Sequence, residues 1–165
     1  MRLLNTYTMP IEIERKYLVI GDAWRSLATP KLYKQGYIYT ENSVTVRVRL
    51  IEDQGYLTLK GKRKGASRAE FEYSIPTEDA RIMLDTLCDR PLIEKKRYRI
   101  ELDDDVWEID EFFGDNQGLI LAEIELSSEE QTIHLPEWVG QEVTEEKKYY
   151  NSYLARHPYQ DWESR

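Results

Sequence analysis

The sequence predicts an α+β protein, mainly antiparallel β, in which about eight strands close into a barrel, or tunnel, with a charged interior and helices packed outside. Turn-forming residues recur at short intervals, and the segments between them alternate apolar and charged residues with the period of two that a strand requires. These alternating segments lie near residues 10–20, 33–40, 43–51, 55–62, 68–75, 92–102, 106–113 and 119–127.

Only a few segments show a helical period. The clearest follows Pro76, where Thr77 is a suitable N-cap and apolar residues recur every three or four positions over residues 77–88. Shorter helices are expected at residues 22–28, 136–140 and 145–158. Because no linker or low-complexity segment interrupts the pattern, residues 1–165 are expected to form a single domain with a core of about residues 10–158.

The polar faces of the strands carry pairs of like charge. In the first strand, Glu12 and Glu14 share a face with Lys16, and side chains two residues apart on a strand lie about 6.5–7 Å apart. One such face alone is typical of a solvent-exposed surface. About seven segments share the design, however, and repeated like-charge pairs cost free energy unless groups of opposite sign lie between them.

A closed barrel would gather these charged faces around its interior. The acidic residues facing inward would be Glu12, Glu14, Glu70, Glu72, Glu108, Asp110, Glu123 and Glu125. The basic residues would be Lys16, Arg47, Arg49, Lys60, Lys62, Arg68, Lys95, Arg97 and Arg99. The apolar faces would then point outward, where Trp107, Tyr149 and Tyr150 are expected to pack under the helices.

Opposed acidic and basic groups predict a bound polyanion together with its counter-cations. Arg and Lys side chains bind phosphate oxygens, and clustered carboxylates are hard oxygen ligands that suit Mg²⁺ or Mn²⁺. A divalent cation between Glu12, Glu14 and a phosphate would relieve the repulsion between the two carboxylates.

Composition argues against several other classes of protein. The formal net charge of -8 disfavours a dedicated binder of duplex DNA or of anionic membranes. No apolar run approaches the roughly 20 residues of a membrane-spanning helix. The single cysteine, Cys88, precludes an intramolecular disulfide and favours a reducing compartment, the cytoplasm. Met9 offers an alternative start, in which case residues 1–8 would be an extension.

The order of motifs resembles that of the CYTH superfamily, also called triphosphate tunnel metalloenzymes. The signature Glu-x-Glu-x-Lys stands here as "EIERK", and the segments that follow it in family order are "KQGYI", "TVRVR", "TLKGK", "SRAEFEY", "IEKKRYRI", "WEIDEF", "LAEIEL" and "GQEVTEEKKYYN". The resemblance covers about residues 10–158 and is strongest to the short bacterial members. It implies a tunnel enzyme that uses a divalent metal to hydrolyse inorganic tripolyphosphate to pyrophosphate and phosphate.

The resemblance also implies roles for individual residues. It implies metal ligands at Glu12, Glu14 and Glu125, with Glu123 close by and Glu108 and Asp110 assisting. It implies substrate binding by Lys16, Arg47, Arg49, Lys60, Lys62, Arg68, Lys95 and Arg97. The catalytic candidates are Tyr37, proposed as a proton acceptor in close relatives, and Lys16, either of which would orient the attacking water.

Two alternatives stay open at this level. The same tunnel would also suit a thiamine triphosphatase, a nucleoside triphosphatase or an adenylate cyclase. A protein of another class, a non-catalytic binder of polyphosphate or nucleotide, would keep the basic residues without needing the paired carboxylates. The family also contains dimers, so a homodimer is a further alternative, while nucleic-acid and membrane partners are not expected.

Overall fold

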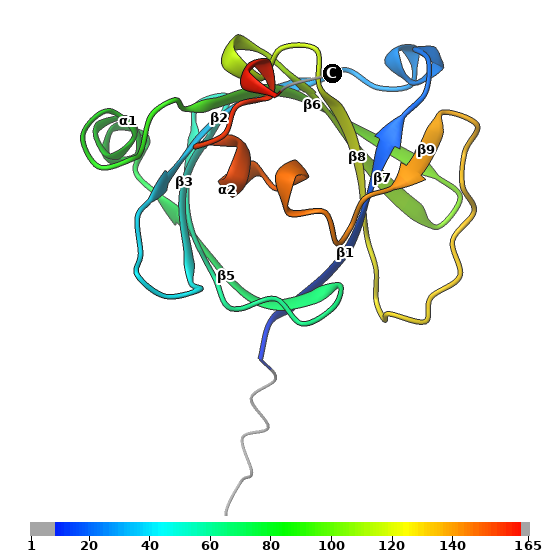
Figure 1. Ribbon diagram of the computed structural model, residues 1–165, viewed down its shortest axis with the longest axis horizontal. Coiled ribbons are helices and arrows are strands. Elements are labelled where there is room, and N and C mark those ends of the chain that lie inside the picture. The colour runs from blue at the N-terminus through cyan, green and yellow to red at the C-terminus, as the bar shows by residue number, and fades with distance from the viewer. Residues whose placement is uncertain (1–8, 163–165) are drawn as a thin grey trace, which may run out of the picture.

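The computed structural model describes residues 9–162, so the extension considered above, residues 1–8, lies outside it. Nine strands form one antiparallel sheet that closes on itself (Figure 1). The strands are β1 (Ile11–Val19), β2 (Lys31–Ile38), β3 (Thr45–Ile51), β4 (Gln54–Lys60), β5 (Ser67–Ile75), β6 (Ile93–Leu102), β7 (Asp105–Phe112), β8 (Ile120–Glu125) and β9 (Val139–Glu142). None of the helices within residues 9–162 has the length and apolar character that a membrane span requires.

The first strand closes the barrel. The strands follow the order β5-β4-β3-β2-β6-β7-β8-β1, and β1 then pairs with β5, where Ile11 lies opposite Ala69. Beyond the residues of β1 that pair with β5, the same edge of β1 pairs with β9, where Val19 lies opposite Val139. The predicted eight-stranded antiparallel barrel is therefore confirmed, with β9 as an added edge strand.

Two α-helices and four 3-10 helices complete the described chain. They are η1 (Ala23–Ser26), α1 (Thr77–Thr86), η2 (Gly114–Asn116), η3 (Lys147–Tyr149), α2 (Asn151–Leu154) and η4 (Tyr159–Asp161). Pro76 is the N-cap of α1, so Thr77 is the first residue of the helix and not its N-cap as predicted, and its hydroxyl donates instead to the carbonyl of Asp53. The helix predicted over 136–140 is wrong: a turn there leads directly into β9.

The outward faces of the strands form the main hydrophobic core. Its buried members are Tyr17, Trp24, Tyr98, Ile100, Trp107, Ile109, Ala122, Ile124, Leu126, Trp138 and Val139. Trp107 is fully buried and makes edge-to-face contacts with Tyr17 and Trp138, both at 5.6 Å between ring centroids. The segments carrying Trp24 and Trp138 thus cover the apolar outside of the barrel, as the inverted pattern of the strands requires.

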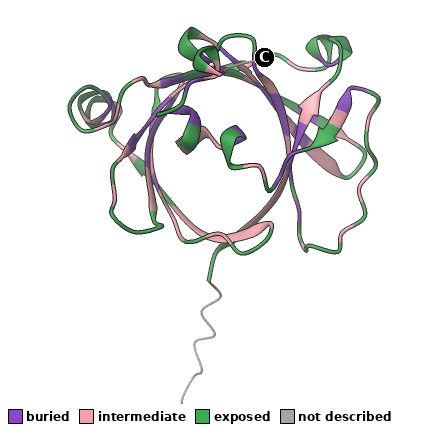
Figure 2. Cartoon of the chain, in the orientation of Figure 1, coloured by how far each residue is buried: buried purple, intermediate pink, exposed green. Residues whose placement is uncertain are grey.

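The C-terminal segment behaves differently from the prediction, because it enters the barrel. In the view down the barrel, α2 and η3 lie within the ring of strands (Figure 1) and carry both buried and exposed residues (Figure 2). Inward-facing Ile93, Phe112 and Leu121 form an apolar layer with Tyr149 and Leu154. The expectation that Tyr149 packs outside is therefore wrong, since an apolar layer inside the barrel accepts it.

The predicted single helix over 145–158 is also divided. Tyr150 has an extended conformation, with φ -75° and ψ 136°, between η3 and α2. Its hydroxyl donates to the carbonyl of Thr144 at 2.9 Å, and its ring lines the interior cavity described below. The break therefore turns Tyr150 and Asn151 toward the charged interior, and the expectation that Tyr150 packs outside is wrong as well.

Close packing of the segment between α1 and β6 against β2 leads to a prediction about Gly36. A Cβ at this position would lie 2.7 Å from Cys88 Cβ and 2.8 Å from Leu92 Cδ2. We expect Gly36→Ala to lower the free energy of unfolding by about 1–3 kcal/mol, because the neighbours must move apart. Denaturant unfolding measures this change.

The matched control is Gly61→Ala, where the nearest neighbour of an added Cβ, Ala69 Cβ, is 3.4 Å away. This variant should unfold within about 1 kcal/mol of the wild type. Equal effects of the two substitutions would contradict the packing argument.

Candidate functional site

A charged cavity of about 270 Å³ occupies the interior of the barrel. The predicted residues that line it are Glu12, Glu14, Lys16, Tyr37, Arg47, Arg49, Lys60, Arg68, Lys95, Arg97, Glu108, Glu123 and Glu125. All eight strands of the closed barrel contribute lining residues, with Lys60 coming from β4 and Arg68, together with Glu70 and Glu72, from β5. The period of two brings residues that are distant in the sequence onto one inner surface.

Carboxylates of like charge face one another across β1, β8 and β7. Glu14 lies opposite Glu125, and Glu123 lies opposite Glu108. Burial, followed by the charges of Glu123 and Glu12, raises the pKa of Glu14 to about 7. Burial also raises the pKa of Glu125, helped by the charge of Glu12. This side of the cavity therefore has too little positive charge for its carboxylates.

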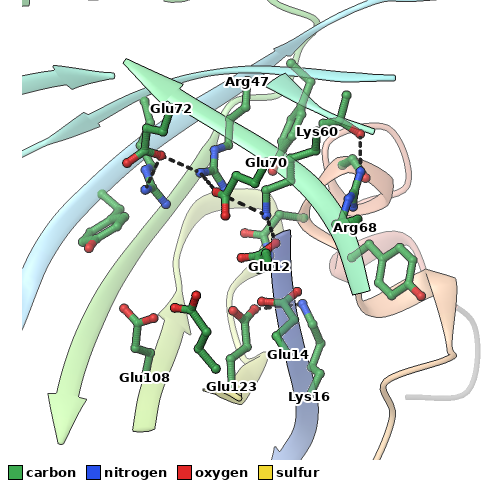
Figure 3. Close-up of a pocket in the computed structure, with 18 of the residues that line it drawn as sticks. Glu12, Glu14, Lys16, Arg47, Lys60, Arg68, Glu70, Glu72, Glu108 and Glu123 are labelled. Atoms are coloured by element: carbon green, nitrogen blue, oxygen red, sulfur yellow. Dashed lines mark hydrogen bonds and ion pairs between the residues drawn. The ribbon is translucent and has the colours of Figure 1, made fainter. Parts of the chain in front are cut away.

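Basic side chains neutralise the neighbouring carboxylates. Lys60 Nζ lies 2.6 Å from Glu12 Oε2, and Lys16 Nζ lies 2.9 Å from Glu123 Oε1 (Figure 3). Burial disfavours the charged form of Glu123, but Lys16 and Arg97 outweigh it and hold its pKa well below the usual range. Among residues 9–162, Glu125 has no such partner.

The donor set fits a divalent cation. Within the described residues no three His, Cys, Asp or Glu side chains converge as a ready-made metal site, because Lys60 and Lys16 draw two of the carboxylates aside. Hard carboxylate oxygens without a full complement of positive charge are nevertheless what Mg²⁺ and Mn²⁺ require. Glu14 and Glu125, opposite each other and with raised pKa values, are the residues most in need of such a cation.

The opposite side of the cavity carries the basic residues. In Figure 3, Glu108, Glu123 and Glu14 point inward from one side, and Arg47 and Lys60 point inward from the other. Glu72 receives Arg47 at 3.3 Å and Arg49 at 3.2 Å, so acidic residues also lie among the basic ones.

Both guanidinium groups keep an unused donor. Within the described chain, the Nε atoms of Arg47 and Arg49 are buried without a hydrogen-bond partner. Burial, together with the charges of Arg47 and Arg97, lowers the pKa of Arg49 to about 10. An anion bound in the cavity beside these two arginines would supply negative charge that the burial of Arg49 calls for.

Two predicted site residues do not line the cavity. Lys62 is exposed beyond the end of β4, where Gly61 interrupts the strand. Asp110 faces inward but is 1% exposed, because Arg97 binds it through two nitrogens at 2.7 and 2.8 Å and Lys95 binds it at 2.8 Å. Burial opposes ionisation of Asp110, but Arg97 and Lys95 outweigh it and lower its pKa.

Several lining residues escaped the sequence analysis. They are Tyr33, Thr45, Arg63, Tyr150, Asn151 and Ser152. Arg63 reaches the cavity because the chain leaves the strand pattern at Gly61, and its Nη1 lies 3.8 Å from Glu14 Oε1. Tyr33 and Thr45 had a usable signal, since Tyr33 shares the inward face of β2 with Tyr37 and Thr45 shares that of β3 with Arg47.

The closed barrel, whose interior is lined by both acidic and basic side chains, defines a tunnel protein suited to a small polyanion. Residues 10–156 match the family model for the CYTH domain, and the chain therefore belongs to the CYTH family. It is 48% identical over 151 residues to an inorganic triphosphatase of Acetivibrio thermocellus, with 92% of this chain and 97% of that protein covered. It is 38% identical over 148 residues to an inorganic triphosphatase of Nitrosomonas europaea, with 87% and 96% covered.

Solved structures agree on the fold. The crystal structure of the inorganic triphosphatase NE1496 superposes with a TM-score of 0.62 at 35% identity, covering 87% of this chain and 97% of that one. A putative adenylate cyclase from Bacillus halodurans has a TM-score of 0.60 at 19% identity, covering 75% and 84%. At that identity the second likeness concerns the fold alone.

Because Glu14 and Glu125 lie opposite each other, we expect Glu125→Gln to change both the stability of the metal-free protein and its stabilisation by metal. Removing one charge of the Glu14–Glu125 pair should stabilise the metal-free protein by about 0.5 kcal/mol. The same change should abolish most of the stabilisation that excess Mg²⁺ or Mn²⁺ confers, because a ligand is lost. Thermal unfolding with EDTA and with metal measures both effects.

Glu101→Gln is the control, since Glu101 is exposed and pairs with Arg99 outside the cavity. It should alter neither quantity. Full metal-induced stabilisation in Glu125→Gln would exclude Glu125 as a ligand.

Asp110 gives a separate prediction about structure. Asp110→Asn should lower the free energy of unfolding by about 3 kcal/mol, because it leaves buried Lys95 and Arg97 without their shared counter-ion. Glu108→Gln, which removes a partly exposed partner of Arg97, should cost less than about 1 kcal/mol. If Asp110→Asn retained wild-type stability but lost metal-induced stabilisation, Asp110 would instead be a metal ligand.

Proposed function

We propose that this protein hydrolyses inorganic tripolyphosphate to pyrophosphate and phosphate in a reaction that depends on Mg²⁺ or Mn²⁺. The main support is the cavity itself, where carboxylates with raised pKa values, Glu14 and Glu125, share one interior with arginine and lysine side chains. The two relatives named inorganic triphosphatases, each matched over nearly its whole length, support the same substrate. The whole chain would act as one tunnel domain.

The basic residues would bind and align the phosphate chain. Arg47, Arg49, Lys60, Arg68, Lys95 and Arg97 line the cavity and carry the donors that phosphate oxygens accept. Held in this way, the terminal phosphorus is presented in line with an attacking water, and the equatorial oxygens are stabilised as negative charge redistributes.

The carboxylates would hold the cation. Glu12, Glu14 and Glu125 are the proposed ligands, with Glu123 and Glu108 next to them. When bound, the metal supplies positive charge that lowers the barrier to phosphoryl transfer. Lys16 donates to Glu123 and to the carbonyl of Tyr149. When Glu123 lies next to a bound metal, its bond to Lys16 would weaken, and the ammonium of Lys16 could then contact substrate or water.

The reaction breaks one phosphoanhydride bond. Water adds to the terminal phosphorus, the bridging P–O bond breaks, pyrophosphate leaves with the bonding electron pair, and the proton that the water loses is taken up by the phosphate products or by solvent. Tyr37 and Lys16 line the cavity within reach of its contents and are the proposed catalytic side chains. Tyr37 lies on β2 opposite Arg47 on β3, which places its phenol beside the phosphate-binding residues.

Substrate preference tests the proposal directly. With Mg²⁺ or Mn²⁺ we expect faster phosphate release from tripolyphosphate than from ATP, thiamine triphosphate or pyrophosphate, and no release with EDTA. Glu12→Gln should reduce kcat/KM by about 100-fold or more, because it removes a ligand and frees Lys60 from its partner.

Glu101→Gln should retain wild-type activity and controls for the loss of a negative charge. A preference for ATP or thiamine triphosphate would keep the tunnel and change the substrate. Tight binding of tripolyphosphate without any cleavage would favour a non-catalytic binder.

A further inference from the structure

A chain of hydrogen bonds connects Lys95 to Tyr37 along the wall of the cavity. Lys95 Nζ donates to Asn151 Oδ1 at 3.0 Å, and Gln35 Nε2 donates to the same oxygen at 3.3 Å. Gln35 Nε2 also donates to the Tyr37 hydroxyl oxygen at 2.8 Å. Lys95 and Gln35 are 1% and 0% exposed, so water does not compete for these bonds.

The chemistry of Lys95 fixes the direction of every bond in this chain. A lysine ammonium can only donate, so the atom of Asn151 facing it must be the oxygen. The group of Gln35 that faces this oxygen must then be its NH₂ group. Because that NH₂ group has two hydrogens, it also donates to Tyr37, whose oxygen is the acceptor.

An unpartnered oxygen supports this assignment. Among the described residues Gln35 Oε1 is buried without a hydrogen-bond partner. Rotating the amide would offer this oxygen to the Tyr37 hydroxyl but would bring it against Asn151 Oδ1, which Lys95 holds in place. The network therefore leaves one acceptor unused in order to present the NH₂ group to Tyr37.

The Tyr37 proton is consequently left free. Its oxygen accepts from Gln35, and within residues 9–162 its O–H group has no acceptor. The phenol lines the cavity, and the guanidinium of Arg68 is near enough to interact electrostatically with it. An ionised phosphate oxygen can only accept a hydrogen bond, so it is the complement of this free donor.

We propose that Tyr37 donates a hydrogen bond to a phosphate oxygen of the substrate, and that Gln35 and Asn151 are positioning residues that set this polarity. The assignment rests on the proposed function, and it makes Tyr37 a substrate-binding donor and not the proton acceptor that the family resemblance implies. Asn151 begins α2, so the C-terminal segment takes part in the site through this network.

Tyr37→Phe distinguishes the two roles. A lost donor should raise KM for tripolyphosphate by about tenfold while kcat changes by less than about twofold. The dependence of kcat on pH, from neutral to alkaline, should keep its wild-type shape. A fall in kcat of about 100-fold or more with unchanged KM, or the loss of an alkaline rise, would overturn the proposal, because these are the signatures of a general base.

Substitutions of the positioning residues test the polarity. In Gln35→Glu a carboxylate accepts the Tyr37 proton and turns it away from the substrate, so KM should rise. Adding Tyr37→Phe to Gln35→Glu should then change KM by less than about twofold, because the donor is already lost. A full further increase in KM would overturn the proposal and would indicate that Gln35→Glu acts through its charge alone.

Two substitutions of Asn151 test its positioning role, one that keeps the accepting oxygen and one that removes it. Asn151→Asp keeps an oxygen that accepts from Lys95 and Gln35, so it should retain wild-type KM within about threefold. Asn151→Leu removes that acceptor and should raise KM about as much as Tyr37→Phe does. Equal kinetics in these two variants would contradict the positioning role.

Binding measured without catalysis separates this inference from the proposed function. Calorimetric titration of the wild type and Tyr37→Phe with tripolyphosphate, in EDTA, should show the same loss of affinity as KM does. A wild type that neither binds nor cleaves tripolyphosphate would overturn the proposed function and this assignment with it. A wild type that binds and cleaves it, with Tyr37→Phe unchanged in affinity, would overturn only the assignment.

Discussion

The balance of charge inside a closed barrel is the constraint on which the rest of the structure depends. Carboxylates that face each other across neighbouring strands, such as Glu14 and Glu125, are unfavourable unless positive charge lies close by. Lys60 and Lys16 supply part of it from within the chain. A bound divalent cation of the kind that the family implies would supply the remainder.

This constraint also explains the inverted arrangement of the barrel. Once the charged faces point inward, the apolar faces, including Trp107 on β7, must be covered from outside, and Trp24 and Trp138 provide much of that cover. One end of the interior is apolar as well, because Ile93, Phe112 and Leu121 pack against the C-terminal segment. The charged cavity is therefore bounded, and Asn151 and Tyr150 reach it from this segment.

Ion pairs within the cavity fall into two kinds with different consequences. Asp110 is enclosed by Lys95 and Arg97, which makes it a structural counter-ion for two basic residues that line the cavity. Glu14 and Glu125 have no comparable partner close by and stay available to a cation. Burial separates these roles, because an enclosed carboxylate cannot exchange its partners without leaving two charges unpaired.

The sequence by itself determined the strands and which residues face inward, because a period of two assigns each side chain to one face whatever the neighbouring strands are. For that reason most of the predicted site residues line one cavity, including Glu12 and Arg97 from distant strands. Only the tertiary structure decided the rest. Lys62 turns away and Arg63 enters because the strand ends at Lys60, and Asn151 reaches Lys95 through a non-local contact that no local period encodes.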